Sequence, residues 1–248
     1  MVKGLDTFRK YFADYEEQYV LIGGAACDIL FESNEVNFRA TRDLDMVLIV
    51  EALTPEFGEK FWKFIADGKY RNKATSGVNP QFYRFDKPED DKFPKMMELF
   101  CRSSFELRNA EGITPIHIDD EISSLSAILL NDDYYKALLN GKVMRNGLSV
   151  LRPEYIILFK AKAYLDLKMQ KDLGEKVDSS DIKKHKKDVL RIASELMLEK
   201  VEELPIAVDT DIHRFINLLE QEPFDQNSLK RYMLKNEDVV EVLKRVFG

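Results

Sequence analysis

The sequence predicts an α+β protein, in which a mixed β-sheet with flanking helices is followed by a C-terminal helical lobe. Short apolar runs rich in β-forming residues alternate with helical patterns as far as Val150. From Pro153 onward the pattern is helical only. We therefore expect an α/β lobe over residues 1–152 and a helical lobe over residues 153–248.

The composition is that of a soluble globular chain, with 45% hydrophobic and 33% charged residues. The net charge of −7 argues against a protein that binds nucleic acid through its overall charge. A local basic patch is compatible with this net charge. No apolar run approaches the ~20 residues of a membrane span, and the N-terminus lacks a signal-peptide core. With two cysteines, free thiols are expected rather than a disulfide framework. These features predict a cytoplasmic protein.

A strand, a Gly-Gly turn and a helix follow one another from Tyr19. Tyr19–Ile22 is a short apolar run typical of a buried strand. Gly23 and Gly24 allow a sharp turn and a close approach of the backbone to a ligand. The helix predicted over Ala25–Phe31 begins at this turn, so its free amide groups and its dipole favour a bound phosphate.

Two carboxylates stand at the head of the next predicted strand, Met46–Val50. Asp43 and Asp45 are two residues apart, so on a strand they project to the same side. Two negative charges so close repel each other unless a cation lies between them. A hard divalent ion, Mg²⁺ or Mn²⁺, bound together with the phosphates of a nucleotide is the chemistry that this pair favours.

This order of features resembles the nucleotidyltransferase superfamily of DNA polymerase β. Arg39 and Thr41, in RATRDLD, resemble the R-x-T-x-D-x-D version found in the abortive-infection type E nucleotidyltransferase toxins. The resemblance is strong over residues 19–51 and weaker elsewhere. It implies a nucleotidyltransferase-type sheet, transfer of NMP from an NTP, and a nucleotide site that includes Gly23, Gly24, Arg39 and Thr41. It also implies tRNA or another RNA as acceptor and a cognate antitoxin as partner.

The superfamily adds a third carboxylate from a neighbouring strand, between two hydrophobic residues. Met97-Glu98-Leu99 looks like that context, so the resemblance implies that Glu98 completes the metal site and helps to deprotonate the acceptor. Asp86 is the competing candidate. We favour Glu98 because it lies within an apolar run and not at its edge.

The other elements expected in this lobe have ordinary local signals. They are a helix at Leu5–Glu17, a helix from Pro55 capped by Thr54, strands at Gln81–Phe85, Lys95–Phe100 and Ser123–Leu130, a helix at Asp132–Leu139, and a hairpin over Lys142–Val150 that turns at Asn146-Gly147. The helix from Pro55 carries aromatic residues at helical spacing, which is typical of core. His117, between two isoleucines, is expected to be a packed residue and not a metal ligand.

The helical lobe is expected to contain five helices. They cover Pro153 to about Lys171, Asp181 to about Lys200 with Ser180 as cap, Asp211–Glu220, Ser228–Leu234 and Glu237–Phe247. The resemblance implies a lysine-bearing helix after the catalytic lobe, and Lys160 is the candidate that would balance triphosphate charge.

The helix from Asp181 is rich in lysine, and its sequence leaves two interpretations open. Lys183, Lys184 and Lys187 form either a solvated charged face or a contact surface for a polyanionic acceptor such as RNA. Lys184, Asp188 and Arg191 are expected on one polar face. Two other function classes also remain: a non-catalytic interaction protein of the same fold, and a nucleotidyltransferase that acts on a small molecule such as an antibiotic.

Overall fold

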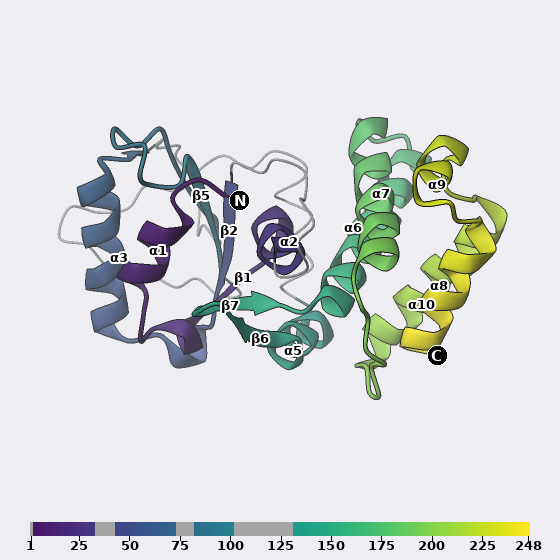
Figure 1. Ribbon diagram of the computed structural model, residues 1–248, viewed down its shortest axis with the longest axis horizontal. Helices are drawn as coiled ribbons and strands as arrows, with labels where there is room; N and C mark the ends of the chain where they lie inside the picture. The colour runs from purple at the N-terminus through teal and green to yellow at the C-terminus, as the bar shows by residue number, and fades with distance from the viewer. Residues whose placement is uncertain (1, 33–42, 73–81, 102–130) are drawn as a thin grey trace. The chain divides into compact units, whose positions relative to one another are not determined.

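The computed structural model describes residues 2–32, 43–72, 82–101 and 131–248 (Figure 1). The chain divides into two compact units, Met1–Asp119 with Lys142–Leu151, and Asp120–Gly141 with Arg152–Gly248. The hairpin therefore belongs to the first unit and the helix before it to the second. The helix before the hairpin belongs to the second unit because its Tyr134 contacts two residues of that unit. The Tyr134 ring lies 5.5 Å from that of Phe159, and its hydroxyl donates to Asp211 at 3.1 Å.

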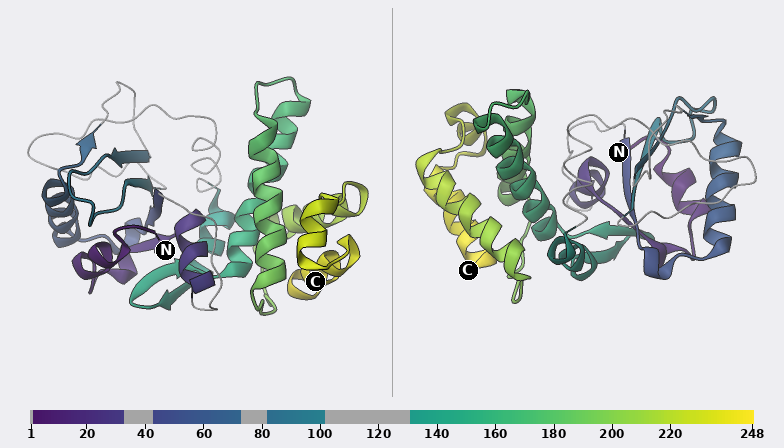
Figure 2. Two further views of the ribbon diagram at one scale, coloured as in Figure 1. Left: turned by 45° about the horizontal axis from the view of Figure 1, so that its top comes forward. Right: turned by 180° about the vertical axis from the view of Figure 1, so that it is seen from behind.

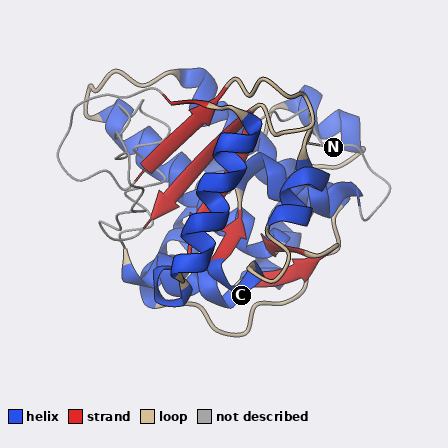
Figure 3. Cartoon of the chain, turned by 90° about the vertical axis from the view of Figure 1, so that its left-hand side faces the viewer, coloured by secondary structure: helices blue, strands red, loops and turns tan. Residues whose placement is uncertain are grey.

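The described part of the first unit contains a seven-stranded mixed sheet, as expected. Its spatial order is β3 (Arg71–Asn72), β4 (Phe82–Asp86), β5 (Met96–Cys101), β2 (Asp43–Leu48), β1 (Tyr19–Leu21), β7 (Leu148–Leu151) and β6 (Lys142–Arg145). The pairs β2–β5 and β1–β7 are parallel and the others antiparallel, so the arrows point both ways (Figure 3). The strand expected at Ser123–Leu130, and also Arg39, Thr41 and His117, lie outside the described residues.

The helices of the first unit are divided between the two faces of the sheet. α1 (Leu5–Tyr11) and α3 (Pro55–Gly68) lie on one face, and α2 (Gly23–Glu32) lies on the other (Figure 1). Two short 3₁₀ turns, Glu16–Gln18 and Val50–Ala52, lead into β1 and out of β2. The two faces thus have different surroundings, which matters for the acids of β2.

α1 is shorter than the predicted Leu5–Glu17. It ends at Tyr11, and the chain then turns through Asp14, whose φ of 76° is in the left-handed region. A short polar side chain tolerates that conformation better than a branched one. The turn sends the chain back toward β1, a tertiary requirement that overrides the helical pattern.

An aromatic core joins α1 and α3 to the sheet. The expectation that the aromatic row of α3 is core is confirmed for Phe57, Phe61 and Phe64, all fully buried. The Phe61 ring lies 5.5 Å from that of Phe85 on β4, and Thr54 caps the helix by accepting from the Phe57 amide at 3.3 Å. This face of the sheet is therefore occupied by hydrophobic packing.

The hairpin and the helix before it turn at glycines for different reasons. Asn146 and Gly147 have φ of 52° and 71°, as the predicted two-residue turn requires. Gly141 ends α5 (Asp132–Asn140) with an ordinary φ of −85°. A Cβ there would lie 2.3 Å from the Tyr155 ring, so close packing explains this glycine.

The second unit is built from helices that pack side by side (Figure 2). Besides α5 they are α6 (Pro153–Asp172), α7 (Ser179–Glu195), α8 (Ile206–Gln221), α9 (Gln226–Tyr232) and α10 (Asn236–Phe247). No described helix has both the length and the apolar character needed to cross a membrane.

The bounds of α7 and α8 differ most from the predicted ones, while α9 lies two residues earlier than predicted and α10 begins one residue earlier. Asp178, not Ser180, caps α7 and accepts from the Ser180 amide at 2.8 Å. α7 ends at Glu195, because Leu196 is extended and the chain runs on to pair with α10 through Val201. α8 begins at Ile206, well before Asp211, and the Asp133 carboxylate of α5 accepts from an amide of its first turn at 2.9 Å.

Phe64→Ala is expected to lower the free energy of unfolding by about 3–5 kcal/mol, because it leaves a cavity among several aromatic rings. Lys63→Ala, one residue away and exposed, serves as control and should change it by no more than about 0.5 kcal/mol. Urea denaturation measures both. Equal effects of the two substitutions would contradict the described packing of α3.

Candidate active site

Strand alternation and register bring three acids to one face of the sheet. Asp43 and Asp45 project from β2 on the face opposite the aromatic core, because Leu44 and Met46 between and after them are buried. In the parallel pair of β2 and β5, Asp45 is the register partner of Glu98. Residues opposite each other in neighbouring strands share a face, so Glu98 lies beside the aspartates.

Asp86 lies on the same face and farther away. It is at the end of β4, where its register partner in β5 is Met96, which in turn faces Asp43. One strand therefore separates Asp86 from the aspartate pair, whereas Glu98 is on the adjacent strand. Of the two candidates for a third carboxylate, Glu98 is nearer to the pair.

The start of α2 touches Asp45. The predicted glycine turn at a helix N-terminus is confirmed: α2 begins at Gly23, whose φ is 60°, and Gly24 behind it is buried. A Cβ on Gly23 would lie 2.2 Å from Asp45 Oδ2. The Ile22 amide donates to the Asp45 carbonyl at 3.0 Å. Only glycine meets both the left-handed backbone and this contact, so the helix N-terminus and the carboxylate share one site.

Glu98 is the most buried acid of the group, with 7% of the residue exposed. Arg84 on β4 donates to Glu98 Oε1 from Nε at 2.8 Å and from Nη2 at 2.6 Å. Burial raises the pKa of Glu98, Arg84 opposes that rise, the charge of Asp43 adds to it, and a hydrogen bond with Asp45 lowers it. The net result is a raised pKa of Glu98, and burial is its main cause.

The donor set suits a hard cation. Asp43, Asp45 and Glu98 offer carboxylate oxygens, the ligands that Mg²⁺ and Mn²⁺ prefer. Within the described ranges, however, no three acidic, histidine or cysteine side chains already stand as a closed metal cage. Glu98 is turned to Arg84, whereas the two aspartates are half-buried and reachable. The aspartate pair therefore fits an ion as it stands, and Glu98 would join after leaving Arg84.

Arg84 is the residue that the sequence analysis missed. Its signal was present, since a lone cation in the strand run FYRFD lies two residues from Asp86 and so on the same face. Its partner could not be found without the register between β4 and β5, which places Arg84 opposite Glu98.

Lys160 and the basic helix lie in the second unit. Lys160 Nζ is 3.1 Å from Asp188 Oδ2, and both side chains are largely buried, at 13% and 7% exposure. Asp188 therefore does not lie on an exposed polar face of α7 as predicted, because it forms this buried ion pair with α6. Lys183 and Lys187 are exposed and Lys184 is half-buried.

Arg84→Met in metal-free protein is expected to lower the free energy of unfolding by about 3 kcal/mol, because it leaves a buried carboxylate without its cation. Adding Glu98→Gln should restore much of the loss, since the uncompensated charge is then gone. Urea denaturation with EDTA measures both. A double variant no more stable than Arg84→Met alone would show that the pair is not what holds Glu98.

Comparisons with known proteins report fold likeness only. No family model matches the sequence, and no curated protein matches it. Among solved structures, the chain aligns with the crystal structure of an antigenic nucleotidyltransferase-like protein from Paracoccidioides brasiliensis, at 17% identity and a TM-score of 0.47. The alignment covers 99% of this chain and 94% of that one. The α+β assignment itself rests on the strands, registers and helices described above.

Proposed function

We propose that the protein is a divalent-metal-dependent nucleotidyltransferase that transfers a nucleoside monophosphate from an NTP to an acceptor and releases pyrophosphate. One observation carries the proposal. Asp43, Asp45 and Glu98 share a face of the sheet at the point where the glycine start of α2 meets Asp45. Acids for a metal ion and helix amides for phosphates thus lie together, which is what a nucleotide–metal complex needs.

Asp43 and Asp45 would hold Mg²⁺ or Mn²⁺, and Glu98 would complete the ligand set. When bound, the ion neutralises phosphate charge and polarises the phosphoryl group that is transferred. Gly23 and Gly24 would let backbone amides at the start of α2 approach the triphosphate. The family resemblance adds Arg39 and Thr41 to the nucleotide site.

The reaction needs a base for the acceptor. The acceptor oxygen attacks the α-phosphorus of the NTP, a new P–O bond forms, and the bond to the pyrophosphate leaving group breaks. The proton of the acceptor hydroxyl goes to a carboxylate, and Glu98 suits that role because its pKa is raised. Arg84 would keep Glu98 oriented until the metal ion binds. Most of the catalysis is then positioning and charge neutralisation.

We further propose that this nucleotidyltransferase is the toxin of a toxin–antitoxin or phage-defence pair and that its acceptor is tRNA or another RNA. It is supported by the R-x-T-x-D-x-D resemblance of RATRDLD and by the lysines of α7. Lys160 would serve the triphosphate only at the expense of its ion pair with Asp188. Pyrophosphate release, measured with each NTP, Mg²⁺ or Mn²⁺ and a total RNA pool, tests the assignment.

Absence of turnover in that screen, with every NTP and acceptor pool, would overturn the proposal. Calorimetry then separates the remaining classes. A non-catalytic protein of this fold should bind no NTP in a metal-dependent way, whereas an enzyme for small-molecule acceptors should still bind NTP with Mg²⁺.

Asp43→Asn and Asp45→Asn are each expected to abolish transfer and to weaken Mn²⁺ binding, while the metal-free protein stays as stable or becomes slightly more stable. Each change deletes a ligand and also relieves repulsion between acids. Calorimetric Mn²⁺ titration and melting in EDTA measure the two effects. Glu59→Gln, an exposed acid on α3, is the control. Metal-free destabilisation by several kcal/mol would instead indicate a structural role for the aspartates.

Gly23→Ala is expected to remove Mn²⁺ and nucleotide binding, because its Cβ would displace the Asp45 carboxylate. Gly174→Ala is a matched control, since Gly174 also has a positive φ, of 87°, and a Cβ there meets nothing within 4 Å. Both substitutions carry a backbone strain of about 1–2 kcal/mol. Only the first should alter calorimetric binding, and equal binding by both variants would remove the turn from the site.

A further inference from the structure

One cavity lies entirely within the helical unit. Its volume is about 780 Å³, within the range of small-molecule sites. α6, α7, the link between α8 and α9, and the first turn of α9 enclose it, and its charged lining consists of Lys168, Lys171, Asp172, Lys183, Lys186, Lys187, Glu222 and Asp225. None of these residues belongs to the carboxylate site.

The lining carries five lysines against three acids, in a chain whose net charge is −7. Two of the acids already have partners. Glu222 pairs with Lys168 at 3.0 Å and accepts from the Tyr164 hydroxyl at 3.2 Å. Asp225 caps α9 and accepts from the amide and the hydroxyl of Ser228, each at 2.9 Å. Lys168 thus offsets the charge of Glu222, the charge of Asp225 remains beside Lys187, and five lysines against three acids leave the lining with a net positive charge.

Because of helical spacing, only some of the lysines of α7 line the cavity. Lys183 and Lys187 are one turn apart, line the cavity and are exposed, and the described residues include no hydrogen-bond or ion-pair partner for either. Lys184 is the neighbour of Lys183 in sequence and does not line the cavity. Two ammonium groups thus project at the cavity rim without a direct ion pair to a described residue, and the carboxylate of Asp225 lies near enough to Lys187 to interact with its charge.

Lys186 shapes the cavity wall. Its ammonium donates to the carbonyls of Glu222 and Pro223, the latter at 3.2 Å, and lies over the rings of Tyr164 and Phe224 at 5.7 and 5.5 Å. These contacts tie α7 to the link after α8. Burial lowers the pKa of Lys186, so an anion bound alongside would favour its charged form. The contacts of Lys186 therefore preform this wall.

We propose that this cavity binds a small organic phosphate, of the size of a nucleoside diphosphate, with its phosphates on Lys183 and Lys187. Lysine ammonium groups are good point-charge partners for phosphate, and the hydroxyl of Ser179 in the lining, which accepts from Lys171, can donate its own proton to a phosphate oxygen. Leu190 and Phe224 supply an apolar wall for the organic part. This site needs no metal and goes beyond the proposed transfer reaction, and it assigns Lys183 and Lys187 to a small ligand in place of an RNA acceptor.

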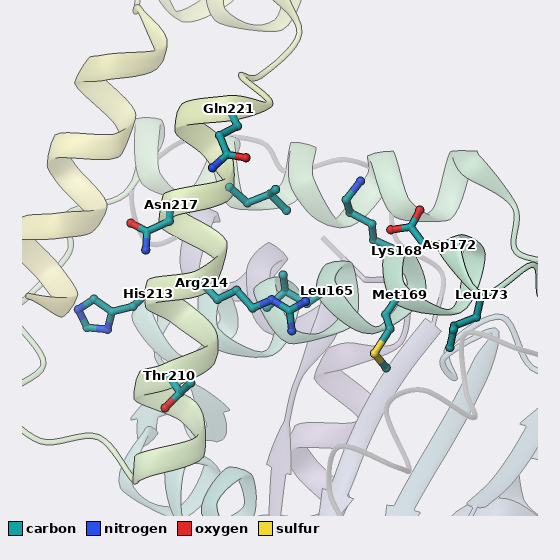
Figure 4. Close-up of a pocket in the computed structure, with 11 residues that line it drawn as sticks. Leu165, Lys168, Met169, Asp172, Leu173, Thr210, His213, Arg214, Asn217 and Gln221 are labelled. Carbon is teal, nitrogen blue, oxygen red and sulfur yellow. The ribbon is translucent and has the colours of Figure 1, made fainter.

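A neighbouring cavity provides a control (Figure 4). This control cavity lies between α6 and α8 and has a volume of about 620 Å³. It shares Lys168 and Asp172 with the proposed phosphate site. Arg214 extends across it toward Leu165, and the apolar side chain of Met169 lies at its side (Figure 4). Its cations include no pair of lysines one turn apart, so we expect no comparable phosphate binding there.

The test is calorimetric titration of the full chain with ADP and with inorganic pyrophosphate, in EDTA at low salt. EDTA removes divalent ions, so the carboxylate site has no metal to bind phosphates and its acids disfavour them. The wild type is expected to bind ADP, and the Lys183→Ala/Lys187→Ala variant to bind it more weakly by about tenfold or more, since two charge-assisted contacts are lost. Lys184→Ala and Arg214→Ala should bind as the wild type does.

Melting without ligand checks that each variant is folded, and Lys187→Gln alone gives a milder second test with a smaller loss. The Asp43→Asn/Asp45→Asn variant should bind ADP normally in EDTA, so failure here and failure of the proposed transferase remain distinct. Absence of ADP binding, or equal binding by the lysine variants, would overturn the proposal. Binding of single-stranded RNA through Lys183 and Lys187, without binding of ADP, would also overturn the proposal.

Discussion

The register between the parallel strands β2 and β5 is the constraint on which the candidate active site depends. It sets Asp45 against Glu98, and through the next pair it sets Glu98 against Arg84. Side chains alternate along a strand, so a shift by one residue would send Glu98 into the aromatic core and bring Met97 to the acids. The buried residues on the other face, Leu44 and Met97 among them, hold this register, so hydrophobic packing on one face positions charge on the other.

Grouping acids on a sheet costs stability, and the structure limits that cost in two ways. The most buried acid, Glu98, has its own cation in Arg84, whereas Asp43 and Asp45 keep partial contact with water. The fully buried aromatic rings of α1 and α3 stabilise the opposite face, where no carboxylate is needed. An ion that binds at the aspartates would therefore relieve the repulsion between them.

Much of the site could be predicted because its signals are local. A strand, two glycines, a helix and an Asp-x-Asp follow in order, and each depends on neighbours within a few residues. The parts that were missed depend on contacts between distant segments: the start of α8 on Asp133, the burial of Asp188 on Lys160, and the orientation of Glu98 on Arg84. Composition and periodicity contain no information on such partners, so these were visible only in the folded chain.

The lysines of α7 illustrate the same limit in functional terms. As a run in sequence, Lys183, Lys184 and Lys187 formed one basic group, interpreted as a whole either as a solvated face or as a contact surface for a polyanion. On the helix, Lys183 and Lys187 face a cavity, Lys184 does not, and Lys186 is fixed to two backbone carbonyls. Lysines that are consecutive in sequence therefore do not form one surface. Successive residues of a helix are rotated by about 100°, so their side chains have different surroundings. Only lysines on the same face can contact one ligand.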